Sequence, residues 1–172
     1  MPSVTMHDPV DSTARELRQL DPRTEERLRE LGAAAMPMHR LKRTGAAPML
    51  FNGRTVATVC GVTPALPFWY ELNLHRTAID SWITDVRLFR KAGDQPDRFR
   101  VAEHDTVEAA TAWLEGYRPD DDAVLPPEFA AAGQSAATLA LAAARLQLQL
   151  EQLRDHYRTL LGDLLYALTP PA

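Results

Sequence analysis

The stretch PFWYELNLHRTAIDSWITDVRLFRK, residues 67–91, decides the fold class. Apolar and polar side chains alternate over residues 68–76 and again over 82–90, and the short run TAIDS separates the two segments. A period of two is typical of strands with one buried face, and a short polar connection favours an antiparallel pair. The face predicted to be buried carries Phe68, Tyr70, Leu72, Leu74, Trp82, Thr84, Val86 and Leu88.

The flanking sequence extends this pair into a larger sheet. Asn52-Gly53 separates a short β-prone run at 49–51 from a longer one at 54–60, and an Asn-Gly pair in this setting predicts a hairpin turn. The segment RFRVAE, residues 98–103, is predicted to add a strand after a polar turn. We therefore expect an antiparallel β-meander of about five strands.

A helix is expected directly after the sheet, because the period of the apolar residues changes from two to about 3.6 at Asp105. Asp105 and Glu108 have the spacing of a capping box, and Gly116 is the expected end of the helix. The apolar side of this helix, which we expect to cap the sheet, carries Val107, Ala110, Trp113 and Leu114.

The last predicted element is a long helix over residues 129–168. Its apolar residues follow alternating steps of three and four, as in a coiled coil. A helix of this length is about 60 Å long, which is more than a small sheet can cover. We expect it to pair with a second copy or to fold back on the N-terminal helices. The predicted oligomer interface comprises Leu146, Leu150, Leu153, Tyr157, Leu160 and Leu164.

Two short N-terminal helices complete the predicted α+β organisation. They cover residues 11–20 and 22–31, and a linker at 33–48 with the basic core HRLKR follows them. The domain boundaries predicted from these elements are an N-terminal helical segment at 1–36, the sheet with its capping helix at 37–117, an acidic proline-rich linker at 118–128 and an oligomerisation helix at 129–172.

Composition is that of an ordinary globular protein, and charge is distributed unevenly. The net charge is −4, yet residues 39–102 carry ten Lys or Arg against five Asp or Glu, whereas residues 103–172 carry four against eleven. The basic and acidic parts are expected to attract each other, or the basic part meets an anionic partner. With one cysteine, no signal-peptide pattern and no membrane-length apolar run, we expect a cytoplasmic protein.

Motifs for catalysis are not found in the sequence. It has no G-x-S-x-G, no phosphate-binding loop and no dinucleotide-binding glycine pattern, and its five histidines are scattered. The run Asp120-Asp121-Asp122 lacks the ligand spacing of a calcium loop, so a solvated linker is the preferred interpretation. We therefore predict no enzyme, no cofactor and no metal site.

The polar side of the two central strands, together with the next predicted strand at 98–103, is the candidate binding surface. It is predicted to carry basic and aromatic residues together, namely Trp69, His75, Arg87, Phe89, Lys91, Arg98 and Arg100. Cations that neutralise phosphates and rings that stack bases are what a single-stranded nucleic acid requires, although Glu71 and Asp85 on the same side would repel it. The order of strands and helix over residues 54–116 is similar in topology to the Whirly-type single-strand-binding fold, without a matching motif residue.

Aromatic residues and arginine equally anchor protein interfaces. The function predicted first is therefore a non-enzymatic binding or assembly protein that acts as a homo-oligomer, with a dimer as the first guess, or as a subunit of a larger complex. Single-stranded nucleic-acid binding is the alternative.

Overall fold

The computed structural model describes residues 36–91 and 95–169 of the 172-residue chain. The described residues from Pro37 onward form one unit. The predicted helices at 11–20 and 22–31 lie outside the described residues.

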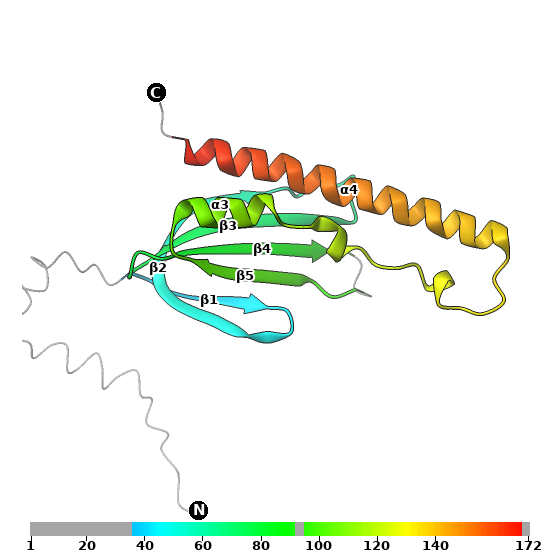
Figure 1. Ribbon diagram of the computed structural model, residues 1–172, viewed down its shortest axis with the longest axis horizontal. Helices are drawn as coiled ribbons and strands as arrows, with labels where there is room; N and C mark the ends of the chain where they lie inside the picture. The colour runs from blue at the N-terminus through cyan, green and yellow to red at the C-terminus, as the bar shows by residue number, and fades with distance from the viewer. Residues whose placement is uncertain (1–35, 92–94, 170–172) are drawn as a thin grey trace, which may run out of the picture. The chain divides into compact units, whose positions relative to one another are not determined.

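Five antiparallel strands form a meander in the order β1-β2-β3-β4-β5 (Figure 1). The predicted α+β meander is therefore confirmed. The strands are β1 (Met38–Arg43), β2 (Ala46–Cys60), β3 (Phe68–Thr77), β4 (Trp82–Arg90) and β5 (Arg98–His104).

The alternation in β3 and β4 places the predicted residues in the core. Tyr70 lies opposite Leu88, and Leu72 lies opposite Val86. All four are buried, as expected when side chains directly opposite each other share one face of an antiparallel pair.

The hairpin predicted at Asn52-Gly53 is wrong. The turn lies at Thr44-Gly45, where Gly45 has a φ of 75°, and the segment predicted as a basic linker is the strand β1. Asn52 and Gly53 instead lie within β2, where this strand changes its partner from β1 to β3. A Cβ at Gly53 would clash with the backbone oxygen of Arg76, so glycine is required here for close approach of two strands.

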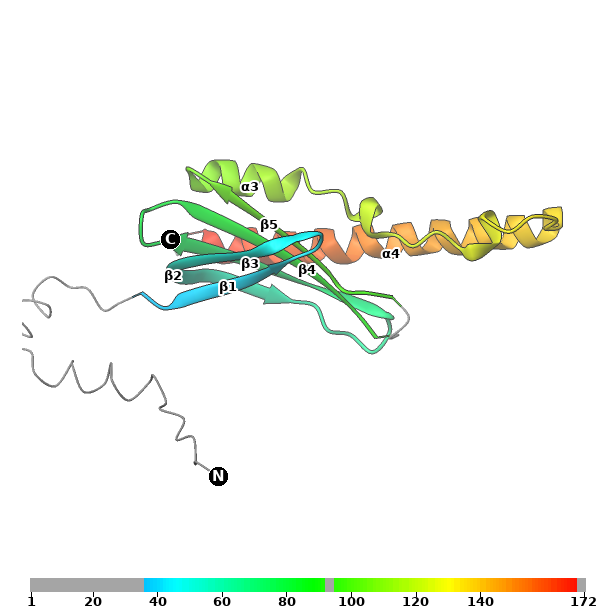
Figure 2. The same cartoon turned by 90° about the horizontal axis from the view of Figure 1, so that it is seen from below.

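This change of partner lets the sheet curl into a half-barrel (Figures 1 and 2). The tip of the β1–β2 hairpin reaches the other edge of the sheet: the Thr44 amide donates to the Phe99 carbonyl at 2.9 Å, and the Phe99 amide donates to Thr44 Oγ1 at 2.8 Å. The first half of β2 and β1 therefore lie over one face of β3 and β4, which we call the concave face.

The helices lie against the opposite, convex face. Thr106 is the N-cap of α3 (Val107–Glu115), because its side chain accepts a hydrogen bond from the Ala109 amide. The cap is therefore one residue later than predicted. Two short 3-10 segments, η2 (Pro119–Asp122) and η3 (Pro127–Phe129), lead to α4 (Ala136–Leu168). α4 begins seven residues later than predicted, because Ser135 caps it and Gly133 has a φ of 77° just before.

The hydrophobic core lies between the convex face and the two helices. Only the C-terminal half of α4 contributes to it, and the N-terminal half extends past the ends of the strands (Figures 1 and 2). The core residues are Phe68, Tyr70, Leu72, Val86, Leu88, Leu114, Leu153, Tyr157, Leu160 and Leu164.

Candidate functional site

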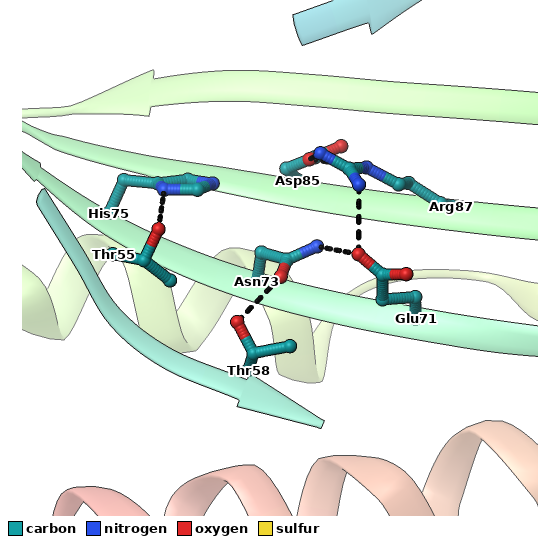
Figure 3. Close-up of polar contacts among 7 residues, drawn as sticks. All are labelled: Thr55, Thr58, Glu71, Asn73, His75, Asp85 and Arg87. Atoms are coloured by element: carbon teal, nitrogen blue, oxygen red, sulfur yellow. Dashed lines mark hydrogen bonds and ion pairs between the residues drawn. The ribbon is translucent and has the colours of Figure 1, made fainter. Parts of the chain in front are cut away.

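A connected polar network occupies the concave face of β3 and β4 (Figure 3). Arg87 is its centre, because its guanidinium donates to Asp85 Oδ2 at 2.6 and 2.7 Å and to Glu71 Oε1 at 2.8 Å. Two carboxylates from neighbouring strands therefore share one cation, so Arg87 is not free to bind a phosphate.

The network continues across β3 to β2. Asn73 donates to Glu71 at 2.9 Å and accepts from the Thr58 hydroxyl at 2.8 Å. Thr55 and His75 form a separate pair on the same face, with the Thr55 hydroxyl 3.0 Å from Nδ1 of His75 (Figure 3). Thr55 and Thr58 are three residues apart in β2, and the shift of register between Thr55 and Ala57 lets both contact polar side chains of the central strand.

Burial shifts the acid–base behaviour of two residues of the concave face. Only 3% of His75 is exposed, and burial, with the nearby His39 and Arg87, lowers the pKa of His75 to about 4. Burial raises the pKa of Asp85, while its hydrogen bond and ion pair with Arg87 oppose that rise. His75 is therefore neutral at neutral pH and adds no positive charge to the concave face.

Strand β1 closes one end of the concave face over His75. The His39 ring stacks on Phe51 with 4.9 Å between ring centroids, and its centroid lies 5.2 Å from that of His75. His39 Nε2 also lies 3.0 Å from the Gly53 carbonyl oxygen. The polar side of the sheet, predicted as a binding surface, is consequently an interior at this end, where His75 is buried.

The other end of the concave face is open and aromatic. Trp69 and Phe89 stack on each other with 5.1 Å between centroids, and Phe99 meets Phe89 edge-on. The ammonium of Lys42 lies 5.6 Å from the centre of the Phe99 ring. The pocket at this end has a volume of about 250 Å³ and is lined by Arg40, Lys42, Arg87, Phe89, Asp97 and Phe99.

Four of the seven residues predicted for the binding surface lie together on the concave face: Trp69, His75, Arg87 and Phe89. Lys91, just beyond the end of β4, donates from its Nζ to the Thr63 carbonyl at 2.6 Å.

Arg98 and Arg100 do not join the others, and their predicted placement is wrong. In the register of β4 and β5, Arg98 lies opposite Leu88 and Arg100 opposite Val86, so both belong to the convex face. The concave face of β5 carries Phe99 instead. The period of two shows which residues of β5 share a face, but only the register with β4 shows which face that is.

Sequence reasoning missed Arg40 and Lys42, because the segment containing them was interpreted as a linker. One signal was present: Thr44-Gly45, a possible turn, follows HRLKR at once. The Asn-Gly pair close by is the stronger turn signal.

The residues predicted as an oligomer interface fall into two groups. Leu153, Tyr157, Leu160 and Leu164 are buried against the sheet of the same chain. Leu146 and Leu150 precede them and are half-buried. They line a groove of about 370 Å³ beside Phe129, together with Ala143, Gln147, Glu151 and Arg154.

The acidic run 120–122 is not a uniformly solvated linker. Asp122 is fully buried and accepts hydrogen bonds from the hydroxyls of Tyr70 at 2.8 Å and Tyr117 at 2.6 Å. Asp120 forms a bidentate pair with Arg154 of α4 at 2.7 Å. These carboxylates hold the linker to the sheet and to α4.

Within residues 36–91 and 95–169, no three His, Cys, Asp or Glu side chains are grouped so that they could hold a metal ion. No helix in this part of the chain has the length and apolar character needed to cross a membrane. Comparison with protein-family models, curated proteins and solved structures finds no match to the chain.

Proposed function

We propose that the protein is a binding or assembly protein and that it associates through residues 136–152 of α4, which we call the projecting half of α4. The observation that supports this most directly is an apolar stripe that the fold of the single chain does not use. Leu141 is 54% exposed and Leu148 is 56% exposed, although both belong to a well-formed helix.

The stripe has the spacing of a helix-pairing surface. Ala137, Leu141, Ala144 and Leu148 follow steps of four, three and four, which is the a/d pattern of a coiled coil. With about 3.6 residues per turn, this stripe lies on roughly the opposite side of the helix from Leu153 and the other core residues. The same helix therefore presents one apolar side to its own sheet and another to solvent.

A second copy of the chain is the partner that we propose. Alanine at every second position of the stripe lets two helices approach closely, and the leucines between them supply the apolar area that association needs. The half-buried Leu146 and Leu150 line the groove at Phe129, which no residue of the stripe lines, so they are secondary contributors.

The test is the mass of the protein in solution by size-exclusion chromatography with light scattering at micromolar concentrations. We expect the wild type to run as a dimer and the double variant Leu141→Ser, Leu148→Ser to run as a monomer with an unchanged circular-dichroism spectrum. The matched control variant is Val62→Ser, Ile79→Ser, which changes two exposed aliphatic residues in loops of the sheet. This variant should remain a dimer. A wild type that is monomeric over the whole range would contradict self-association.

Single-stranded nucleic-acid binding is a second candidate, favoured by the pocket between β1 and β5. Arg40 and Lys42 are brought there beside Phe89 and Phe99, which combines cations with rings. Arg87 is unsuited as a probe, because its removal would leave Asp85 buried without its cation.

The double variant Arg40→Gln, Lys42→Gln tests this candidate by fluorescence anisotropy with a labelled single-stranded oligonucleotide. The slope of log affinity against log salt should fall by about 0.7 for each phosphate that the variant no longer neutralises. Wild-type protein that fails to bind at low salt would remove this candidate.

A further inference from the structure

A separate pocket lies on the convex side, where the end of α3 meets β5. Its volume is about 350 Å³, within the usual range for small-molecule sites. Its lining combines two arginines, two aromatic rings, a carboxylate and a glycine: Arg100, Trp113, Gly116, Tyr117, Arg118 and Asp121.

The two arginines of this pocket are uncommitted. Among the described residues, neither Arg100 nor Arg118 takes part in a salt bridge or donates a side-chain hydrogen bond. The adjacent Arg98 differs, because its guanidinium donates to the Asp121 carbonyl at 2.7 Å. Two guanidinium groups at one pocket, without a protein acceptor, form a site for a phosphate, whose oxygens match the planar fork of arginine.

The aromatic side of the pocket is held rigidly. The centroids of Trp113 and Tyr117 lie 5.9 Å apart. Tyr117 is fixed on its other side by stacking on Tyr157 at 4.9 Å and by its hydrogen bond to Asp122. Gly116 also lines the pocket and adds no side chain to it, and Trp113 and Tyr117 are both partly exposed. Rigid rings beside cations favour a ligand that carries a planar ring as well as an anion.

We propose that this pocket binds a nucleotide, with its phosphate on Arg100 and Arg118, its base against Trp113 and Tyr117, and a ribose hydroxyl donating to the Asp121 carboxylate. A nucleotide is the ligand class that supplies all three complementary groups in one molecule. The ligand is either a free mononucleotide or one residue of a single strand, because the chemistry presented to the pocket is the same. The inference is independent of the projecting half of α4, which does not line this pocket.

The experiment is titration calorimetry of the full chain with AMP at low salt, with adenosine and inorganic phosphate as separate probes. AMP should bind more tightly than either probe, since it alone engages both the arginines and the rings. The double variant Arg100→Gln, Arg118→Gln should weaken AMP binding by roughly tenfold or more. The matched control Arg54→Gln, Arg145→Gln makes the same change of charge at exposed arginines that line neither this pocket nor the one on the other side of Tyr117, and it should bind as the wild type does.

A short oligonucleotide in the same titration distinguishes the two sources of the ligand. Tighter binding of the oligonucleotide than of AMP, weakened by the same double variant, indicates a residue of a single strand. An affinity for AMP that equals or exceeds the affinity for the oligonucleotide indicates a free nucleotide. The proposal is overturned if neither AMP nor the oligonucleotide binds at millimolar concentration. It is also overturned if inorganic phosphate alone binds as tightly as AMP, or if the double variant binds AMP as tightly as the wild type does.

Discussion

Asp122 joins three parts of the fold that are distant in the sequence. It lies in η2, accepts from Tyr70 of β3 and from Tyr117 at the end of α3, and its backbone carbonyl accepts from the guanidinium of Arg90. Burial and the neighbouring Asp122 raise the pKa of both tyrosines well above the usual value. Both hydroxyls therefore stay protonated and donate over the whole physiological range.

Removing this acceptor should destabilise the protein strongly. We expect Asp122→Ala to lower the free energy of unfolding by about 2–3 kcal/mol, because the buried Tyr70 hydroxyl and the half-buried Tyr117 hydroxyl both lose their acceptor. Asp122→Asn keeps one acceptor oxygen and should lose less. Urea unfolding followed by tryptophan fluorescence measures both, and Asp121→Ala, at the exposed neighbour, should stay within about 0.5 kcal/mol of the wild type. Equal effects at positions 121 and 122 would contradict the assigned role.

His75 should make stability depend on pH. Its pKa is about 4 in the fold and 6.5 in the unfolded chain, so between these values the unfolded chain binds more protons. Protonation therefore favours unfolding, and stability should fall as pH falls from about 6.5 to 4. The full difference corresponds to about 3 kcal/mol.

The pH prediction is measured as the difference in unfolding free energy between wild type and His75→Gln at pH 7.5 and at pH 4.5. This comparison cancels contributions that both proteins share, including those of His104 and His156, whose pKa values burial also lowers. The raised pKa of Asp85 acts in the opposite direction, because protonation at low pH relieves the burial of its charge. A difference that does not change with pH would contradict a buried, neutral His75.

At the scale of elements, α4 is one helix with two roles. Its C-terminal half buries Leu153 and three further residues against the sheet, whereas its projecting half leaves Leu141 and Leu148 in solvent. The helix is continuous, so its projecting half extends beyond the core into a region that has no sheet beneath it.

Truncating one leucine in each half should separate these roles. Leu153→Ala should lower the free energy of unfolding by about 2–5 kcal/mol, because it opens a cavity in a close-packed core. Leu148→Ala should change it by less than about 0.5 kcal/mol when measured at a concentration at which the protein is monomeric. Urea unfolding at low protein concentration makes the comparison, and similar losses at both positions would contradict the division of α4. The substitution Leu153→Asp would place a charge in this core and unfold the chain, so it could not test association.

At the scale of the whole molecule, association and folding should be linked. A dimer that forms only from folded chains is stabilised by mass action, so its melting temperature rises with protein concentration. We expect an increase of roughly 5 °C for a hundredfold rise in concentration. Differential scanning calorimetry of the wild type and of Leu141→Ser, Leu148→Ser measures this, and the double variant should show no such dependence. A wild-type melting temperature independent of concentration would contradict the linkage.

The sequence by itself determined the elements that have a clear period. The alternation around Tyr70 and Leu88 predicted β3 and β4 with their buried faces, and the change of period at Asp105 predicted α3, which ends before Gly116 as expected. These features are local, because a period of two or of 3.6 fixes which side chains share a face whatever lies beyond.

Only the tertiary structure decided what each face meets. Residues 38–43, expected to belong to a linker, form the strand β1. The polar side of β3 and β4 faces the interior of a half-barrel, and Arg98 and Arg100 lie on the other side of the sheet. Register and curl depend on contacts between residues far apart in the chain, which a local pattern does not encode. Gly53 shows most directly where prediction from a local pattern fails. The pair Asn52-Gly53 is typical of a turn, yet the glycine lies within a strand and is required there because the backbone of Arg76 approaches closely.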